Sequence, residues 1–153
     1  MVKSVVKTPC IGVCSTGIGD DVCRGCKRFT HEVIHWNSYS DRERRIIWQR
    51  LDQLLAQVVK AKVLIWDAEK LLGQMSAQQI DFDESRNPYC LFQELLKAGA
   101  SQIKNLSEYG CQLTSEYAAT PLVKLRILID ADFYTLSQVH YQRYFIMPEH
   151  MNS

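Results

Sequence analysis

Four cysteines lie within 17 residues near the start of the chain, spaced Cys10-x3-Cys14-x8-Cys23-x2-Cys26. So many thiols in so short a stretch carry an oxidation risk that ordinary core residues do not. Their number and softness match the ligands that a tetrahedral zinc ion or a small iron–sulfur cluster requires. The cluster therefore predicts an N-terminal metal-binding module, and it constrains the fold more than any other feature of the sequence.

The spacing favours zinc over iron–sulfur without deciding between them. The eight-residue gap is shorter than the roughly 15–20 residues of a zinc ribbon, and it matches neither common ferredoxin pattern. A pair of ligands followed at once by a short helix resembles a compact zinc finger. Four thiolates on Zn²⁺ would carry a net charge of −2, which Arg24, Lys27 and Arg28 are placed to offset. Because the protein fills all four positions, such a site is structural rather than catalytic.

Other metal-binding residue types are less informative. His31 and His35 share one face of the expected helix after the cysteines. We interpret them as residues near the site or on the surface, with His31 as the main rival for one ligand position. Cys90 and Cys111 stand alone in the sequence, and we predict that each is a small buried apolar residue.

The hydrophobic pattern predicts a mainly α fold. A short helix capped by Thr30 should follow the cysteines. A capping box at Ser40 and Glu43 should open a long amphipathic helix from Asp41 to Leu72. We therefore expect a metal-binding module over residues 1–40 and a helical domain over residues 41–153.

Three further helices are expected in the C-terminal region. Asn87-Pro88 begins one that Gly99 ends. Apolar spacing from Ile103 to Tyr117 suggests another, which Gly110 weakens. A last helix begins at Thr120-Pro121, although alternating apolar residues over 123–133 leave a strand there as the alternative.

Charge is unevenly distributed along the chain. The first 50 residues carry nine Lys/Arg against five Asp/Glu, and the remainder carries nine against twelve. A basic metal module could touch nucleic acid, with aromatic residues as a stacking platform for bases. That platform would consist of Trp36, Tyr39, Trp48 and Trp66. The commoner use of such residues is a solvated basic helix face and aromatic core packing, and we favour that interpretation.

Several classes of protein are disfavoured. The N-terminus lacks the apolar core of a signal peptide. The longest apolar run, residues 63–66, is far too short to span a bilayer. We therefore expect a cytoplasmic protein with no membrane partner, in which clustered thiols stay reduced. The sequence contains no phosphate-binding loop and no nucleophile motif, so we expect neither catalytic nor cofactor-binding residues and no enzymatic activity.

Residues 8–51 resemble a known family. The resemblance rests on Pro9-Cys10-x3-Cys14, on Cys23-x-Gly25-Cys26-x-Arg28, on Trp36, and on Ser40-Asp41-x-Glu43-Arg44. These motifs are similar to those of the YdhL-like family, small bacterial cysteine-rich domains of unknown function that are often labelled predicted iron–sulfur proteins. The resemblance implies a bacterial cytoplasmic protein and treats the four cysteines as one site. It supplies no reaction and no substrate.

Together these observations predict an uncharacterised four-cysteine metal-binding protein. We expect a non-enzymatic adaptor or regulatory module with a structural Zn²⁺ and an unidentified protein partner. Two alternatives stay open: an iron–sulfur redox or sensor protein, and a nucleic-acid-binding protein resembling a zinc finger. The sequence leaves the oligomeric state open.

Overall fold

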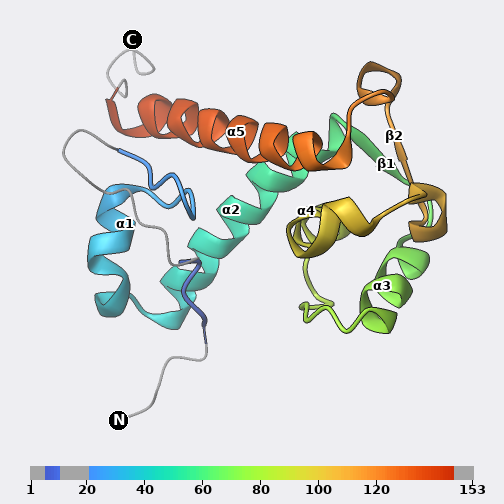
Figure 1. Ribbon diagram of the computed structural model, residues 1–153. Helices are drawn as coiled ribbons and strands as arrows, with labels where there is room; N and C mark the ends of the chain where they lie inside the picture. The colour runs from blue at the N-terminus through green and yellow to red at the C-terminus, as the bar shows by residue number, and fades with distance from the viewer. Residues whose placement is uncertain (1–5, 11–20, 147–153) are drawn as a thin grey trace. The chain divides into compact units, whose positions relative to one another are not determined.

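The computed structural model describes residues 6–10 and 21–146, and helices dominate that part of the chain (Figure 1). The helices and strands are α1 (Thr30–His35), α2 (Asp41–Lys60), β1 (Val63–Ile65), α3 (Ala68–Ala77), α4 (Pro88–Gly99), β2 (Cys111–Leu113) and α5 (Leu122–Tyr141). Short 3-10 helices lie at Trp36–Ser38, Ala100–Gln102, Leu106–Tyr109 and Ser115–Tyr117, and a π-helical turn follows α5 at Gln142–Ile146. The predicted mainly α class is confirmed.

The chain divides into two compact units. The first contains residues up to Leu54 together with those from Phe133 onward, and the second contains residues from Leu55 to Asp132. The divisions fall inside α2 and α5, so each of these helices contributes one part to each unit. The expected boundary between a metal module and a helical domain at residue 40 stays a prediction.

The first unit has a small apolar cluster built on the start of α2. The predicted capping box is confirmed, because the N–H of Glu43 donates to Ser40 Oγ at 3.2 Å and the N–H of Ser40 donates to Glu43 Oε1 at 3.1 Å. One turn later Ile47 and Leu51 point into a cluster with Trp36, and partly buried residues pack around it: Val6, Tyr39, Trp48 and Phe133. The cap begins α2, and the apolar residues in the turns that follow form the face buried in this unit.

The prediction of one helix from Asp41 to Leu72 is wrong beyond Lys60. The chain leaves the helix there and forms β1, whose Val63 and Ile65 pair with Leu113 and Cys111 of the antiparallel strand β2. A new helix, α3, then begins at Ala68, with the Asp67 side chain accepting the N–H of Lys70 at 3.3 Å. Pairing with a strand some fifty residues away overrides the helical spacing of the apolar residues.

The helix expected between Ile103 and Tyr117 is also wrong. Gly110 lies in the left-handed region with φ of +68°, which ends a 3-10 helix and starts β2. Its carbonyl accepts the N–H groups of Trp66 and Asp67 at 2.8 and 3.1 Å. A Cβ at this position would lie 2.2 Å from the carbonyl oxygen of Asp67, so the turn requires glycine.

Helix α4 is confirmed as expected and carries the core of the second unit. Asn87 caps it by accepting the N–H of Tyr89 at 2.9 Å, and the helix runs from Pro88 to Gly99. Its buried face consists of Cys90, Leu91, Phe92, Gln93, Leu95 and Leu96. These side chains, with Leu71 and Met75 of α3, are almost fully buried.

Helix α5 confirms the last predicted helix, so the strand alternative over residues 123–133 is wrong. Leu125 and Ile129 are buried one turn apart on its first half. No helix in the described part of the chain is long and apolar enough to cross a membrane.

Candidate metal centre

The four predicted ligands differ in what the structure says of them. Cys23 and Cys26 are buried, and Cys10 is exposed. Cys14 lies outside the described residues. Within residues 6–10 and 21–146, no three metal-ligating side chains lie together. The structure therefore brings together two of the four cysteines, and the complete four-cysteine site stays a prediction.

Cys23 and Cys26 lie in a tight turn between two paired residues. Val22 and Phe29 form an antiparallel bridge, and inside it the N–H of Cys23 donates to the carbonyl of Arg28 at 2.8 Å. The N–H of Lys27 closes the turn on the carbonyl of Cys23, also at 2.8 Å. This backbone pattern holds both thiols on one short loop.

The sulfur of Cys26 is a hydrogen-bond acceptor. Arg28 Nε donates to Cys26 Sγ at 3.2 Å, and the backbone N–H of Arg28 donates to the same sulfur. The pKa of the Cys26 thiol is raised overall, because burial outweighs these bonds and the charge of Arg28, which lower it, and the neighbouring Cys23 raises it slightly. Donors of this kind stabilise a thiolate, which is the form of cysteine that binds metal.

Arg28 is held in place by an aromatic ring. Its guanidinium lies 4.9 Å from the ring centre of Trp36, and the guanidinium of Arg44 lies 5.4 Å from the same ring. Arg44 Nε also donates to the Trp36 carbonyl at 3.0 Å. Trp36 is therefore buried with two cations near its ring, which argues against a base-stacking platform at this residue.

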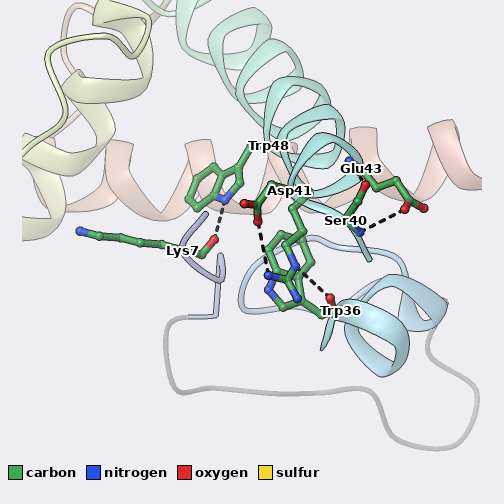
Figure 2. A network of polar contacts seen from close by, with 7 residues as sticks. Lys7, Trp36, Ser40, Asp41, Glu43 and Trp48 are labelled. Carbon is green, nitrogen blue, oxygen red and sulfur yellow. Dashed lines mark hydrogen bonds and ion pairs between the residues drawn. The ribbon is translucent and has the colours of Figure 1, made fainter. Parts of the chain in front are cut away.

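The segment that carries Cys10 is attached to α2. Trp48 Nε1 donates to the carbonyl of Lys7 at 2.7 Å, as Figure 2 shows beside the contacts of Trp36, Ser40 and Glu43. Val6 packs against the apolar cluster of the first unit. Residues just before Cys10 and the residues after Cys26 thus contribute to the same core.

A buried ion pair supports the helix that follows the turn. Helix α1 begins at Thr30, so Phe29 rather than the expected Thr30 is the cap residue, and its N–H donates to Glu32 Oε1 at 2.8 Å. Both carboxylate oxygens of Glu32 accept bonds from Arg50 of α2, at 2.5 and 2.6 Å. The Arg50 guanidinium also lies 3.9 Å from the ring centre of Phe29. Nothing in the spacing of these residues predicts the pair.

The two histidines of α1 do not join the two buried thiols. The His31 ring lies 5.9 Å from the ring of Phe29, and His35 is exposed. Their prediction as residues near the site or on the surface is consistent with this placement. Whether His31 replaces a cysteine in a complete site stays open.

The second half of α5 packs against the turn, which sequence reasoning missed. Lys27 Nζ lies 5.7 Å from the ring centre of Phe133, and the Arg24 guanidinium lies 5.2 Å from that of Tyr134. Further along α5, near its C-terminal end, the rings of His140 and Tyr141 contact the ring of Phe29. Burial and the nearby charges of Arg50 and Arg143 lower the pKa of His140. No local motif links residues more than one hundred positions apart in the chain.

The two remaining cysteines are buried, as predicted. Both Cys90 and Cys111 lie in the second unit, and the Cys111 sulfhydryl donates to the carbonyl of Tyr109 at 3.2 Å. Burial raises the pKa of the Cys111 thiol to about 12. Such a thiol stays protonated at neutral pH.

The family comparison matches the N-terminal third of the chain. Residues 8–55 match the model of a family described as "Protein of unknown function (DUF1289)". The matched residues include all four predicted ligands, Trp36 and most of α2. Neither the comparison with curated proteins nor that with solved structures gives a match. The match covers nearly the same stretch as the resemblance noted above, and the narrower YdhL-like name stays a prediction.

Proposed function

We propose that Cys10, Cys14, Cys23 and Cys26 hold one Zn²⁺ in a closed structural site. The observation that carries the proposal is the buried sulfur of Cys26, which accepts two N–H groups of Arg28 inside a C-x2-C turn. A cationic donor at the sulfur does not stabilise a buried thiol that acts only as a small apolar residue. It does stabilise a thiolate ligand, because the donor offsets the negative charge on the sulfur.

The charges around the turn fit a zinc site of four thiolates. Such a site has a net charge of −2, and the turn that carries Cys23 and Cys26 also carries Arg24, Lys27 and Arg28. Lys27 and Arg28 are almost fully buried. Arg28 donates to the sulfur of Cys26, and the negative charge of a thiolate centre would offset its buried positive charge.

The ion would have a structural role. With four protein ligands no position is left for substrate or water, so Zn²⁺ supplies folding free energy to a region with a small hydrocarbon core. The protein would then be a non-enzymatic cytoplasmic adaptor or regulatory module that acts through a protein partner. An iron–sulfur cluster on the same cysteines and nucleic-acid binding by the basic first half are the competing functions.

Metal analysis of protein purified without air tests the proposal. We expect about one zinc per chain and no visible colour. Cys14→Ser and Cys26→Ser should lose the stoichiometric zinc, whereas Cys90→Ser, which alters a buried cysteine of the second unit, should keep it. Iron with acid-labile sulfide would replace the proposal by the iron–sulfur function. Full zinc content in Cys26→Ser would show that the turn is not part of the site.

A further inference from the structure

Lys27 combines a strained backbone with a buried charge. Its φ is +65°, in the left-handed region where a non-glycine residue costs about 1 kcal/mol. Its side chain is only 1% exposed. A lysine therefore occupies a position where glycine would fit without strain and where burial of an ammonium is costly. Its contacts give the reason.

The Lys27 ammonium bonds to the turn that holds the thiols. Nζ donates to the carbonyl oxygens of Arg24 and Gly25 at 2.5 and 3.2 Å. These are the two residues between Cys23 and Cys26. The same ammonium lies 5.7 Å from the ring centre of Phe133 on α5. The charge is thus satisfied by the turn on one side and by an aromatic ring on the other.

Fixing these two carbonyls also fixes the amides of the turn. In a trans peptide the C=O and N–H point in opposite directions. Holding the carbonyls of Arg24 and Gly25 on the ammonium therefore turns the N–H groups of Gly25 and Cys26 away from it. N–H groups directed to one side of a tight turn form a concave site that favours anions, including thiolate sulfur.

The backbone of Lys27 contributes as well. Because the backbone of Lys27 has a left-handed conformation, the chain reverses direction between Cys26 and Arg28. The N–H of Arg28 then reaches the Cys26 sulfur. The N–H of Lys27 meanwhile binds the carbonyl of Cys23 at 2.8 Å. One residue thus holds the turn through its N–H, its φ and its ammonium.

We propose that Lys27 is a positioning residue that sets the Cys23–Cys26 turn in its ligand-ready form before metal binds. This inference rests on the proposed zinc site and deepens it. A turn already closed loses less conformational entropy when the ion binds, so the ammonium should raise zinc affinity without touching the metal.

Two variants of Lys27 and one control variant test the role of its ammonium. Lys27→Met removes the ammonium and keeps an unbranched side chain of similar length. Lys27→Gly also removes the ammonium but relieves the left-handed strain. Lys62→Met is the matched control, because Lys62 is another buried lysine, 3% exposed, whose ammonium bonds to Asp132 in the second unit.

Two readouts are needed, one of them without metal. Zinc affinity is measured by competition with a chromophoric chelator. The alkylation rates of Cys23 and Cys26 by iodoacetamide are measured on metal-free protein by peptide mass spectrometry. We expect both Lys27 variants to bind zinc about tenfold or more weakly and to be alkylated faster at both thiols. Lys62→Met should match the wild type in both readouts.

The outcomes distinguish this inference from the proposed function. Unchanged zinc affinity and unchanged alkylation in both Lys27 variants would overturn the positioning role. If Lys27→Met fails to fold, the strain-relieved Lys27→Gly carries the same test. A wild type that binds no zinc removes the proposed function. The alkylation rates of the metal-free proteins then still show whether Lys27 closes the turn.

Discussion

The two compact units use the same residue type in opposite ways. In the first unit the buried sulfur of Cys26 accepts hydrogen bonds from a cation, Arg28. In the second unit the buried Cys111 donates its own proton to the carbonyl of Tyr109, and burial alone raises its pKa. The direction of the hydrogen bond thus separates a candidate ligand from a small apolar residue, although both cysteines are buried.

The cores of the two units also differ in how many charged residues are buried beside the apolar ones. The hydrocarbon cluster of the first unit is small, and charged residues are buried around it: Lys27, Arg28, Glu32 and Arg44. The second unit is built on apolar faces of α3 and α4. We infer that the first unit depends on electrostatic contacts and a bound ion, whereas the second depends on hydrophobic burial.

The largest expected effect is the loss of metal from the first unit. Cys26→Ser should lower the free energy of unfolding of that unit by about 5 kcal/mol or more, because binding free energy of a structural zinc is folding free energy. Residue-resolved amide hydrogen exchange measures the two units separately. In Cys26→Ser the amides of the second unit should stay protected from exchange. Within the first unit, the amides of the turn closed by Lys27 should stay more protected than the others.

The matched control for that variant is Cys111→Ser. It should weaken protection in the second unit and leave zinc content unchanged. If both cysteine variants lose zinc, or if both keep it, the contrast between the two sulfurs is wrong.

The next effect concerns the turn of the second unit. Gly110→Ala places a Cβ 2.2 Å from the Asp67 carbonyl oxygen at a left-handed position, so we expect a loss of about 4 kcal/mol. Gly73→Ala is the control, because Gly73 lies inside α3 with nothing within 4 Å of its added Cβ. Urea unfolding should show a gain of about 0.5 kcal/mol there. Equal stability of the two variants would contradict the assigned role of the turn.

The ion pairs Glu32–Arg50 and Lys62–Asp132 have the same N–O distance of 2.5 Å but differ in exposure to solvent. Comparing them tests how burial changes the contribution of an ion pair to stability. Glu32→Gln leaves Arg50 without its carboxylate in a site where the two side chains are 7% and 17% exposed. We expect a loss of about 3 kcal/mol in the free energy of unfolding. Asp132→Asn should cost less, because the Asp132 side of the pair is 52% exposed and open to water, although the Lys62 side chain that it leaves is only 4% exposed. Chemical denaturation of both variants measures the difference, and a larger loss at Asp132 would reverse the comparison.

The smallest effect is a dependence on alkaline pH. The Cys111 thiol stays protonated in the folded chain to about pH 12, whereas it ionises near 9.0 when unfolded. The unfolded state therefore binds fewer protons between these values, and stability falls as pH rises by at most about 1.4 kcal/mol per pH unit. Comparing Cys111→Ala with the wild type from pH 8 to 10 isolates this contribution. Parallel stability curves would show that Cys111 is not responsible.

What the sequence predicts well is local. The capping box at Ser40 and the Asn87-Pro88 start of α4 each specify a helix end through bonds within three residues, and both are present. The helical period of α5 was also sufficient to predict that helix. In these places local preference and the final fold agree.

What the sequence misses depends on distant partners. The break after Lys60 follows from pairing between β1 and β2, and Gly110 accepts bonds from residues more than forty positions earlier. At the candidate site, the spacing of the cysteines predicts the four ligands, and that set stays a prediction. The support of the turn by Phe133 and the pair of Glu32 with Arg50 had no sequence signal. The left-handed Lys27 was likewise hidden, since lysine gives no indication of positive φ.

X-ray absorption at the zinc edge of the purified full chain tests whether the four cysteines bind one Zn²⁺. The account predicts a first shell of four sulfur atoms at about 2.3 Å, lost in Cys14→Ser and Cys26→Ser and kept in Cys90→Ser and Cys111→Ser. If the first shell contains a histidine nitrogen, His31 is a ligand in place of one of the four cysteines. Protein that contains no zinc, or iron in its place, would contradict the account.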